Sequence, residues 1–183
     1  MDYKTKPVSR DTLRKLSKII RNNVFHCKNK FYFDVVTSLE KLPLLFNDVS
    51  VEIVDDNDDE LKDVPCTTTL DELNKYVIKI KESVYEGAYH KKGGYRMHIM
   101  HEICHYLLFT IGFKPYFDRT YRNNELNPYE SIEWQAKALA GEILIPFFET
   151  KGLSESQIRR KCKVSKDAAH KRFVMEMEIN DKK

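Results

Sequence analysis

The fold is decided by one stretch of sequence, Arg96-Met97-His98-Ile99-Met100-His101-Glu102-Ile103-Cys104-His105-Tyr106-Leu107-Leu108, which places the pattern HExxH inside an apolar run. Residues four apart project from nearly the same face of an α-helix, so His101 and His105 can bind one metal ion. Glu102 lies about 100° further round the helix, where its carboxylate can reach a water beside that ion. The pattern is typical of a hydrolytic zinc site. The alternative is a helix whose histidines merely pack or face solvent.

Glycines and a proline bound this expected helix. Gly93 and Gly94 precede the apolar run, and Gly112 and Pro115 follow it as a stop signal. A helix this apolar is usually buried, and polar side chains in a core are costly unless they are paired or bound to metal. Zinc would satisfy both histidines of the pattern.

A catalytic zinc site has three protein ligands and one open position, so a third ligand is expected downstream. The run Asn127-Pro128-Tyr129-Glu130 predicts a helix start, with Asn127 as the N-cap and Glu130 in a capping box, and Pro146 marks the end. Within this helix Glu133 shares a face with two alanines, Ala136 and Ala140, whose small side chains permit a close approach to the first helix.

Glu133 is therefore the expected third ligand. The alternative is a solvated surface carboxylate, which is the usual fate of a glutamate on a helix and the one that we expect for Glu130 and Glu142.

Two segments together resemble the ImmA/IrrE family of zinc metallopeptidases. The first comprises residues 76–88 and 96–108, and the second is Glu133-Trp134-Gln135-Ala136-Lys137-Ala138-Leu139-Ala140-Gly141-Glu142-Ile143-Leu144-Ile145-Pro146, a glutamate-bearing helix that ends in aliphatic residues and a proline. The resemblance extends over residues 30–175. It implies two zinc histidines, His101 and His105, a glutamate ligand, Glu133, and a general base, Glu102.

The sequence departs from the family pattern at a few positions. The family usually has threonine where His98 stands and glycine where Cys104 stands. His98 lies two turns before His105 on the same face, so it either lines the cleft or is a packed or solvent-bonded histidine. Cys104 should face the core. Lys137 and Leu139 replace a common asparagine and phenylalanine, which affects local packing rather than the metal.

The expected fold is α+β, a zincin-like metallopeptidase core with a small β-sheet beside the HExxH helix and a short helical C-terminal segment. Residues 51–54 and 76–80 are predicted strands. Strand 76–80 is either an edge strand that holds extended substrate or a strand internal to the sheet. We expect an N-terminal helical segment at residues 1–29, the metallopeptidase domain at 30–150 and a C-terminal helical segment at 151–183.

The C-terminal segment is basic and predicts two short helices, at residues 154–161 and 165–173, with Ser165 as an N-cap. Its arrangement is similar to a helix-turn-helix. Seven residues supply the positive charge: Arg159, Arg160, Lys161, Lys163, Lys166, Lys171 and Arg172. We expect an element that packs or docks a partner rather than one that reads DNA, and no direct nucleic-acid binding.

Composition fits one small domain, with 183 residues, 32% of them charged, and a formal net charge of +3. We expect a cytoplasmic protein without a membrane partner, because the chain shows no apolar signal segment and no run long enough to span a bilayer. The four cysteines have no CxxC spacing and should be free thiols. The sequence predicts no particular oligomeric state.

Two polar segments complete the expectations. The acidic run at residues 55–60 lacks the glycine and glutamate of a calcium loop and should be a solvated loop. Residues 114–126 lie between the two ligand helices and should rim the cleft.

The function that these features predict is that of a zinc-dependent endopeptidase of the gluzincin type, with Zn²⁺ as cofactor and Glu102 as general base. Candidates for stabilising the oxyanion are His98, Tyr85, Tyr89 and Tyr129. The family resemblance implies that the substrate is a helix-turn-helix transcriptional repressor, whose cleavage relieves repression of a mobile element or stress operon. The alternative is a non-enzymatic DNA-binding or anti-repressor module with a structural metal site.

Overall fold

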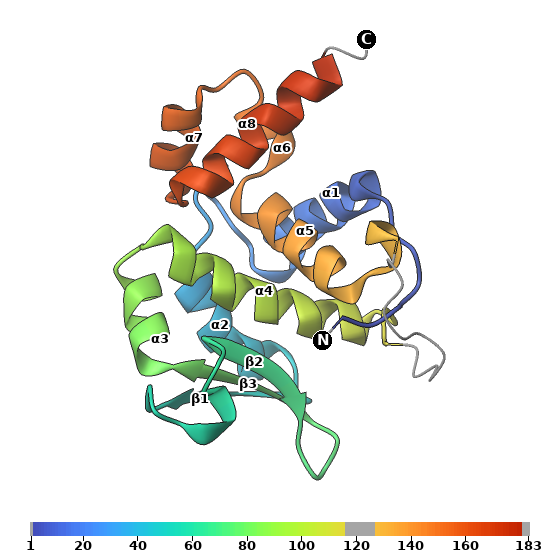
Figure 1. Ribbon diagram of the computed structural model, residues 1–183, viewed down its shortest axis with the longest axis vertical. Coiled ribbons are helices and arrows are strands. Elements are labelled where there is room, and N and C mark those ends of the chain that lie inside the picture. Colours follow the sequence, from blue (N-terminus) through green and yellow to red (C-terminus); the bar gives the residue numbers. More distant parts are fainter. Residues whose placement is uncertain (1, 116–126, 181–183) are drawn as a thin grey trace.

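The structure, a computed structural model, describes residues 2–115 and 127–180. Its α-helices and strands, in chain order, are α1 (Arg10–Ile19), α2 (Val35–Leu45), β1 (Val49–Val54), β2 (Cys66–Leu70), β3 (Tyr76–Lys81), α3 (Glu82–Tyr89), α4 (Gly93–Thr110), α5 (Ile132–Leu144), α6 (Phe147–Thr150), α7 (Glu155–Cys162) and α8 (Lys166–Asn180). A π-helical turn (Ile20–Val24) follows α1, and 3₁₀ turns lie at Asp59–Leu61 and Pro128–Glu130. The expected α+β class, with a small sheet beside the HExxH helix, is confirmed (Figure 1).

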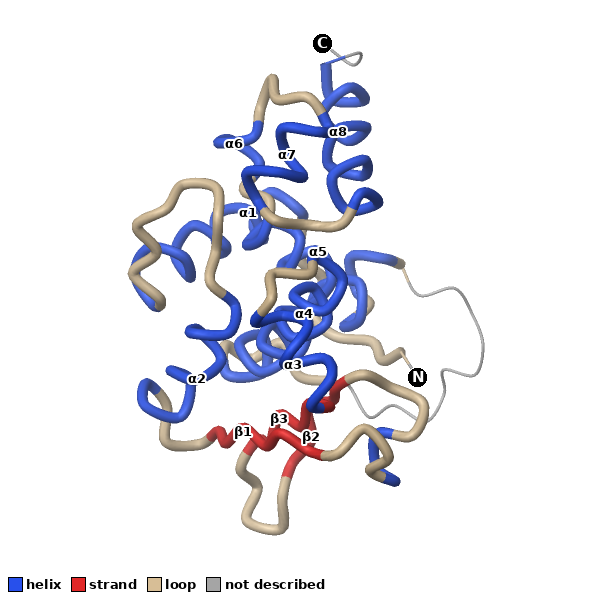
Figure 2. Tube along the Cα trace, turned by 90° about the vertical axis from the view of Figure 1, so that its left-hand side faces the viewer, coloured by secondary structure: helices blue, strands red, loops and turns tan. Residues whose placement is uncertain are grey.

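The sheet has three strands in the order β1-β3-β2, and the helices are stacked on one side of it (Figure 2). β3 pairs with β1 in parallel and with β2 antiparallel. Strand 76–80 is therefore central, so of the two alternatives the internal strand is confirmed and the edge strand is excluded. The edge next to α4 is β2, which the sequence analysis missed, although its three threonines, Thr67 to Thr69, are β-branched residues that favour strands.

Helix α4 lies at the centre of the molecule, between the sheet and α5. Its residues Ile99, Ile103 and Tyr106 are fully buried, and burial extends round most of the helix. That is the position expected for a helix that is apolar on nearly all faces. Gly112 has a φ of +91°, which suits glycine and ends the helix close to the predicted stop.

Helix α5 begins later than the sequence predicted. Asn127 accepts a hydrogen bond from the Tyr129 N–H and caps only the 3₁₀ turn. Ser131 is extended and is the N-cap of α5, where its Oγ accepts from the Trp134 N–H at 2.9 Å. The helix start at Asn127 was therefore wrong, because a second competent N-cap stands four residues further on.

The N-terminal residues are tied to the start of α5. The Thr5 N–H donates to the Glu130 carbonyl at 2.8 Å, the Val8 N–H donates to the Tyr129 carbonyl at 3.0 Å, and α1 then packs along α5. The proposed division of the chain at residues 29 and 150 stays a prediction.

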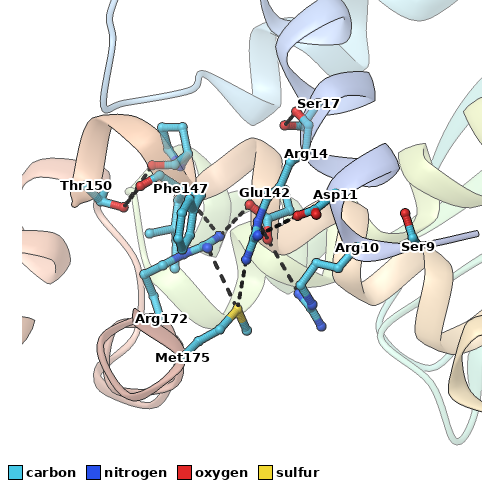
Figure 3. Close-up of polar contacts among 12 residues, drawn as sticks. Ser9, Arg10, Asp11, Arg14, Ser17, Glu142, Phe147, Thr150, Arg172 and Met175 are labelled. Carbon is cyan, nitrogen blue, oxygen red and sulfur yellow. Dashed lines mark hydrogen bonds and ion pairs between the residues drawn. The ribbon is translucent and has the colours of Figure 1, made fainter. Parts of the chain in front are cut away.

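Glu142 of α5 is fully buried among arginines (Figure 3). Its carboxylate accepts a hydrogen bond from Arg172 Nη2 of α8 at 2.8 Å, and Arg10 and Arg14 of α1 each approach to 3.5 Å. The expectation that Glu142 is a surface carboxylate was wrong, and Arg172 belongs to the interior rather than to the basic surface. The sequence around Glu142 or Arg172 indicates neither fact, because the residues that pair with Glu142 come from both ends of the chain.

The two predicted C-terminal helices are present as α7 and α8, although α8 is longer than expected. A second buried cation fixes them to α4, since Arg96 donates to the carbonyls of Phe33 at 2.6 Å and Cys162 at 2.8 Å, and also to that of Lys163. A Cβ at Gly93 would lie 2.3 Å from the Ser165 nitrogen, so only glycine permits this close approach.

Residues 55–60 form an exposed turn, as expected. All four cysteines are free thiols. Within residues 2–115 and 127–180, none of the helices has the length and apolar character needed to cross a membrane.

Replacing Glu142 by glutamine should lower the free energy of unfolding by about 3–5 kcal/mol, because Arg172 would remain as an incompletely paired buried cation. Urea denaturation measures the change. The matched control is Glu86→Gln, which removes an exposed partner 3.7 Å from His90 and should cost less than about 0.5 kcal/mol. Equal stability of the two variants would contradict the role given to the Glu142 carboxylate.

Candidate active site

The structure brings together His101, His105 and Glu133, as the sequence analysis expected. The two imidazole Nε2 atoms are 3.0 Å apart, and the Glu133 carboxylate lies 3.1 Å from His101 Nε2 and 3.3 Å from His105 Nε2. The histidines project from α4, and Glu133 stands in the first turn of α5. Ala136 and Ala140 are fully buried on the facing side of α5, where their small side chains allow the two helices to approach closely.

These three groups fit a metal ion. Zinc binds imidazole nitrogen and carboxylate oxygen at about 2.0–2.2 Å with tetrahedral geometry, which places neighbouring ligand atoms roughly 3.3 Å apart. The observed separations of 3.0 to 3.3 Å agree with that value. Two nitrogens and one carboxylate are also a ligand set that catalytic zinc uses.

Glu133 is held in its ionised form. Hydrogen bonds from His101 and then His105 lower the pKa of its carboxyl well below the usual range. Because the charged carboxylate is the form that binds metal, the local electrostatics favour the ligand state of this residue.

Glu102 lies beside this cluster in a different environment. Its side chain is only 8% exposed, and burial raises the pKa of its carboxyl to about 7, against the opposing effects of His101 and Thr68. Thr68 Oγ1 donates a hydrogen bond to Glu102 Oε2 at 2.8 Å. A carboxyl with a pKa near neutrality can both accept and return a proton.

Thr68 is a residue that the sequence analysis missed. It stands in the middle of β2, so the edge strand of the sheet contacts the second carboxylate of the site directly. The run of three threonines was the available signal, but only the packing of β2 beside α4 shows that the middle one, Thr68, contacts Glu102.

The residues that the sequence suggested for stabilising the oxyanion lie outside the cluster of His101, His105 and Glu133. His98 is exposed on α4. The pKa of its imidazole is lowered by the partial loss of hydration against the protein and by the neighbouring His101 and Lys137. The Tyr85 hydroxyl donates to Glu40 of α2 at 2.6 Å, which occupies it away from a substrate. Tyr89 and Tyr129 are largely exposed. The expected rim at 114–126 falls mostly outside the described residues.

Cys104 is fully buried and faces the core, as predicted, although it stands between the two histidines in sequence. Burial raises the pKa of its thiol well above the usual value, so it remains protonated rather than acting as a thiolate ligand.

Comparison with protein families agrees with this geometry. Residues 67–174 match the family model Peptidase_M78, described as the IrrE N-terminal-like domain. The chain belongs to this family. The match begins in β2, includes the helices that carry the histidines and Glu133, and ends within α8. The expected kinship with the ImmA/IrrE family is confirmed, and with it the assignment to a peptidase family. Neither the curated proteins nor the solved structures gave a match.

In the metal-free protein, Glu102 should make the folded state less stable as the pH rises. Its pKa is raised from 4.5 in the unfolded chain to about 7 on folding, so the folded protein binds the proton more tightly. The stabilising contribution is complete below the unfolded pKa and is lost as the pH rises through the folded pKa. The Glu102→Gln variant lacks this titration.

Urea denaturation in the presence of chelator at about pH 4.5 and pH 8 tests the point. The stability of the wild type relative to Glu102→Gln should fall by up to about 3 kcal/mol between the two conditions. A difference that does not change with pH would mean that the carboxyl titrates as in a free peptide.

Proposed function

We propose that the protein is a zinc-dependent endopeptidase of the gluzincin type, with His101, His105 and Glu133 as ligands of Zn²⁺ and Glu102 as the general base. The observation that carries this proposal is the convergence of three donor atoms from α4 and α5, with a buried carboxyl of raised pKa beside them. Membership of a peptidase family supports the same reading.

In the proposed reaction, zinc supplies Lewis acidity that polarises the scissile carbonyl and makes a water acidic enough to attack near neutral pH. Glu102 accepts a proton from that water and delivers it to the leaving amine. Thr68 orients the Glu102 carboxyl through its hydrogen bond to Oε2. Glu133 would bind the metal as a carboxylate, the form that His101 and His105 already favour in the metal-free protein.

The proposed substrate is a helix-turn-helix repressor in the cytoplasm, whose cleavage would switch on the genes that it silences. Selectivity for one protein requires contacts beyond a small cleft. A basic surface could supply them, because six exposed cations surround a hollow of about 880 Å³ between the start of α4 and the α7–α8 turn. They are Lys91, Lys92, Arg159, Arg160, Lys163 and Lys166.

The same surface favours a second candidate function. None of the six cations has an acidic partner within the part of the chain that the structure describes, so this surface also suits a polyanion. A DNA-binding or anti-repressor module with a structural metal site would use it to bind nucleic acid.

The protein should bind one zinc ion per chain, and Glu133→Ala should weaken binding by more than the ~10–100-fold typical of outer-shell substitutions, since it removes a ligand. Elemental analysis and competition with a chelator measure both. Glu130→Ala is the matched control, because this carboxylate lies three residues away and pairs with Lys4 at 3.3 Å. Absence of transition metal after zinc titration would refute the central assignment.

Glu102→Gln should keep zinc and fold but lose at least about 100-fold in peptide hydrolysis, because the amide preserves shape while removing the base. The assay coexpresses a candidate helix-turn-helix repressor, one encoded near this protein, with the wild type or the variant and detects repressor fragments by blotting. Wild-type cleavage by the variant would exclude Glu102 as the base.

A variant of the basic surface separates the two candidate functions when it is tested for repressor cleavage, for hydrolysis of a short peptide and for binding of operator DNA. Deleting residues after Gly152 is unsuitable, because Glu142 would lose Arg172. Charge reversal at Arg159 and Arg160 leaves the core intact, since both are exposed. Loss of repressor cleavage with retained hydrolysis of a short peptide supports docking. Operator DNA shifted by the wild type but not by this variant, without any cleavage, supports the DNA-binding module.

A further inference from the structure

A groove of about 430 Å³ lies between the α4–α5 pair and α8, and none of the residues of the proposed reaction lines it. This is the size of ordinary ligand sites. Its apolar lining comes from three helices, α4, α5 and α8, and from the residue that ends α5. It comprises Met97, Trp134, Ala138, Ile145, Ala168 and Met175. Exposed apolar concavities of this kind commonly bind a partner or ligand.

The groove lies one helical turn away from the candidate active site along both α4 and α5. Helices α4 and α5 run antiparallel, so residues that precede the histidines on α4 face residues that follow Glu133 on α5 (Figure 1). Met97 lies one turn before His101, and Lys137 lies one turn after Glu133. An extended peptide that leaves the ligand cluster along this seam reaches the groove within a few residues.

The rim of the groove carries unbalanced positive charge. Lys137 and Lys171 are exposed and have no ion-pair partner among the described residues, whereas Asp167 is the one carboxylate in the described lining. Arg172 is engaged by the buried Glu142, as Figure 3 shows. Arg10 lies 5.0 Å from the centre of the Trp134 ring, but it is also 3.5 Å from the Glu142 carboxylate, so the unpaired charge of the rim comes from the two lysines. The rim therefore favours an acidic ligand.

Gly141 leaves the floor of the groove open. A Cβ built at this position meets no atom within 4 Å, so α5 would accept a larger residue here. Glycine is among the least favourable residues in a helix interior. The packing of α5 against its neighbours therefore does not require glycine at position 141, and the open space beside it belongs to the groove.

We propose that this groove is a substrate subsite, which binds a bulky apolar side chain of the peptide substrate with carboxylate side chains next to it. The inference rests on the proposed peptidase function and names a class of sequence that the enzyme selects. Trp134 and Met175 contact the apolar side chain, and Lys137 and Lys171 bind the flanking carboxylates.

The test uses the full-length Glu102→Gln variant and the blocked peptide acetyl-Gly-Gly-Leu-Glu-Glu-Gly-amide as probe. Trp134 is the only tryptophan in the sequence, so intrinsic fluorescence reports from the groove itself. Titration should give a saturable change in emission. Replacing the leucine of the peptide by serine should weaken binding at least about tenfold, and replacing both glutamates by lysine at least about fivefold.

Two sets of variants, each with its own control, locate the binding. Gly141→Leu fills the groove and should weaken binding at least about tenfold. Gly94→Leu is its matched control, because this glycine of α4 also has open space around it but does not line the groove. Lys137→Glu and Lys171→Glu should each weaken binding about fivefold and improve binding of the lysine peptide, while Lys41→Glu on α2 should do neither.

Unchanged affinity in a folded Gly141→Leu variant overturns the proposal, as does indifference to both lysine reversals. An emission change that depends on protein concentration alone also overturns it, because the occupant is then a second copy of the chain. Because binding is measured without hydrolysis, a protein that binds the probe but shows no peptidase activity would contradict the proposed function and leave the subsite supported. A protein that is an active peptidase but binds the probe equally well after Gly141→Leu and both lysine reversals would contradict the subsite and leave the proposed function standing.

Discussion

The packing of α4 against α5 is the contact on which the rest of the structure depends. It is close because α5 presents small, buried side chains, Ala136 and Ala140, to the larger apolar residues of α4. The antiparallel arrangement then sets Glu133 opposite His101 and His105, with donor atoms 3.0 to 3.3 Å apart. A larger residue at either alanine would separate the helices, and the ligand atoms would part with them. The same interface between α4 and α5 therefore packs the core and positions the three candidate metal ligands.

Buried charges hold the C-terminal helices to this interface. Arg96 binds carbonyl oxygens at the end of α7 and before α2, and Arg172 binds the carboxylate of Glu142. Such groups cost free energy to bury, and each is tolerated only because it is paired or hydrogen-bonded. Their directional bonds give α8 a defined position, which apolar packing alone specifies less sharply. That position in turn makes one wall of the groove beside Trp134.

Local signals allowed much of the site to be predicted. HExxH gave the spacing of the histidines, and the alanine face of the second helix made Glu133 a candidate that the family resemblance then favoured. The predictions that were wrong or left open concern features that depend on residues far apart in the sequence. Strand order made β3 central, and the buried partners of Glu142 come from α1 and α8. At the start of α5, two good N-caps compete, and backbone contacts with residues 5 and 8 at the 3₁₀ turn accompany the later start at Ser131.

The two carboxyl groups of the candidate site lie in contrasting environments, and the contrast matches the roles proposed for them. Glu133 is half-exposed and accepts hydrogen bonds from two imidazoles, so its pKa is low and it stays charged. Glu102 is buried beside the sheet, and its pKa is raised to about 7 because burial outweighs the single hydroxyl that Thr68 donates. Neighbouring carboxyls whose pKa values are driven apart can divide the work of ligand and base. Residue type does not distinguish them, since both are glutamates on apolar helices, and the HExxH spacing gives the position of Glu102 but not its pKa. The difference comes from their surroundings, because Thr68 of β2 packs against the buried Glu102, whereas Glu133 in the first turn of α5 keeps about half of its side chain exposed.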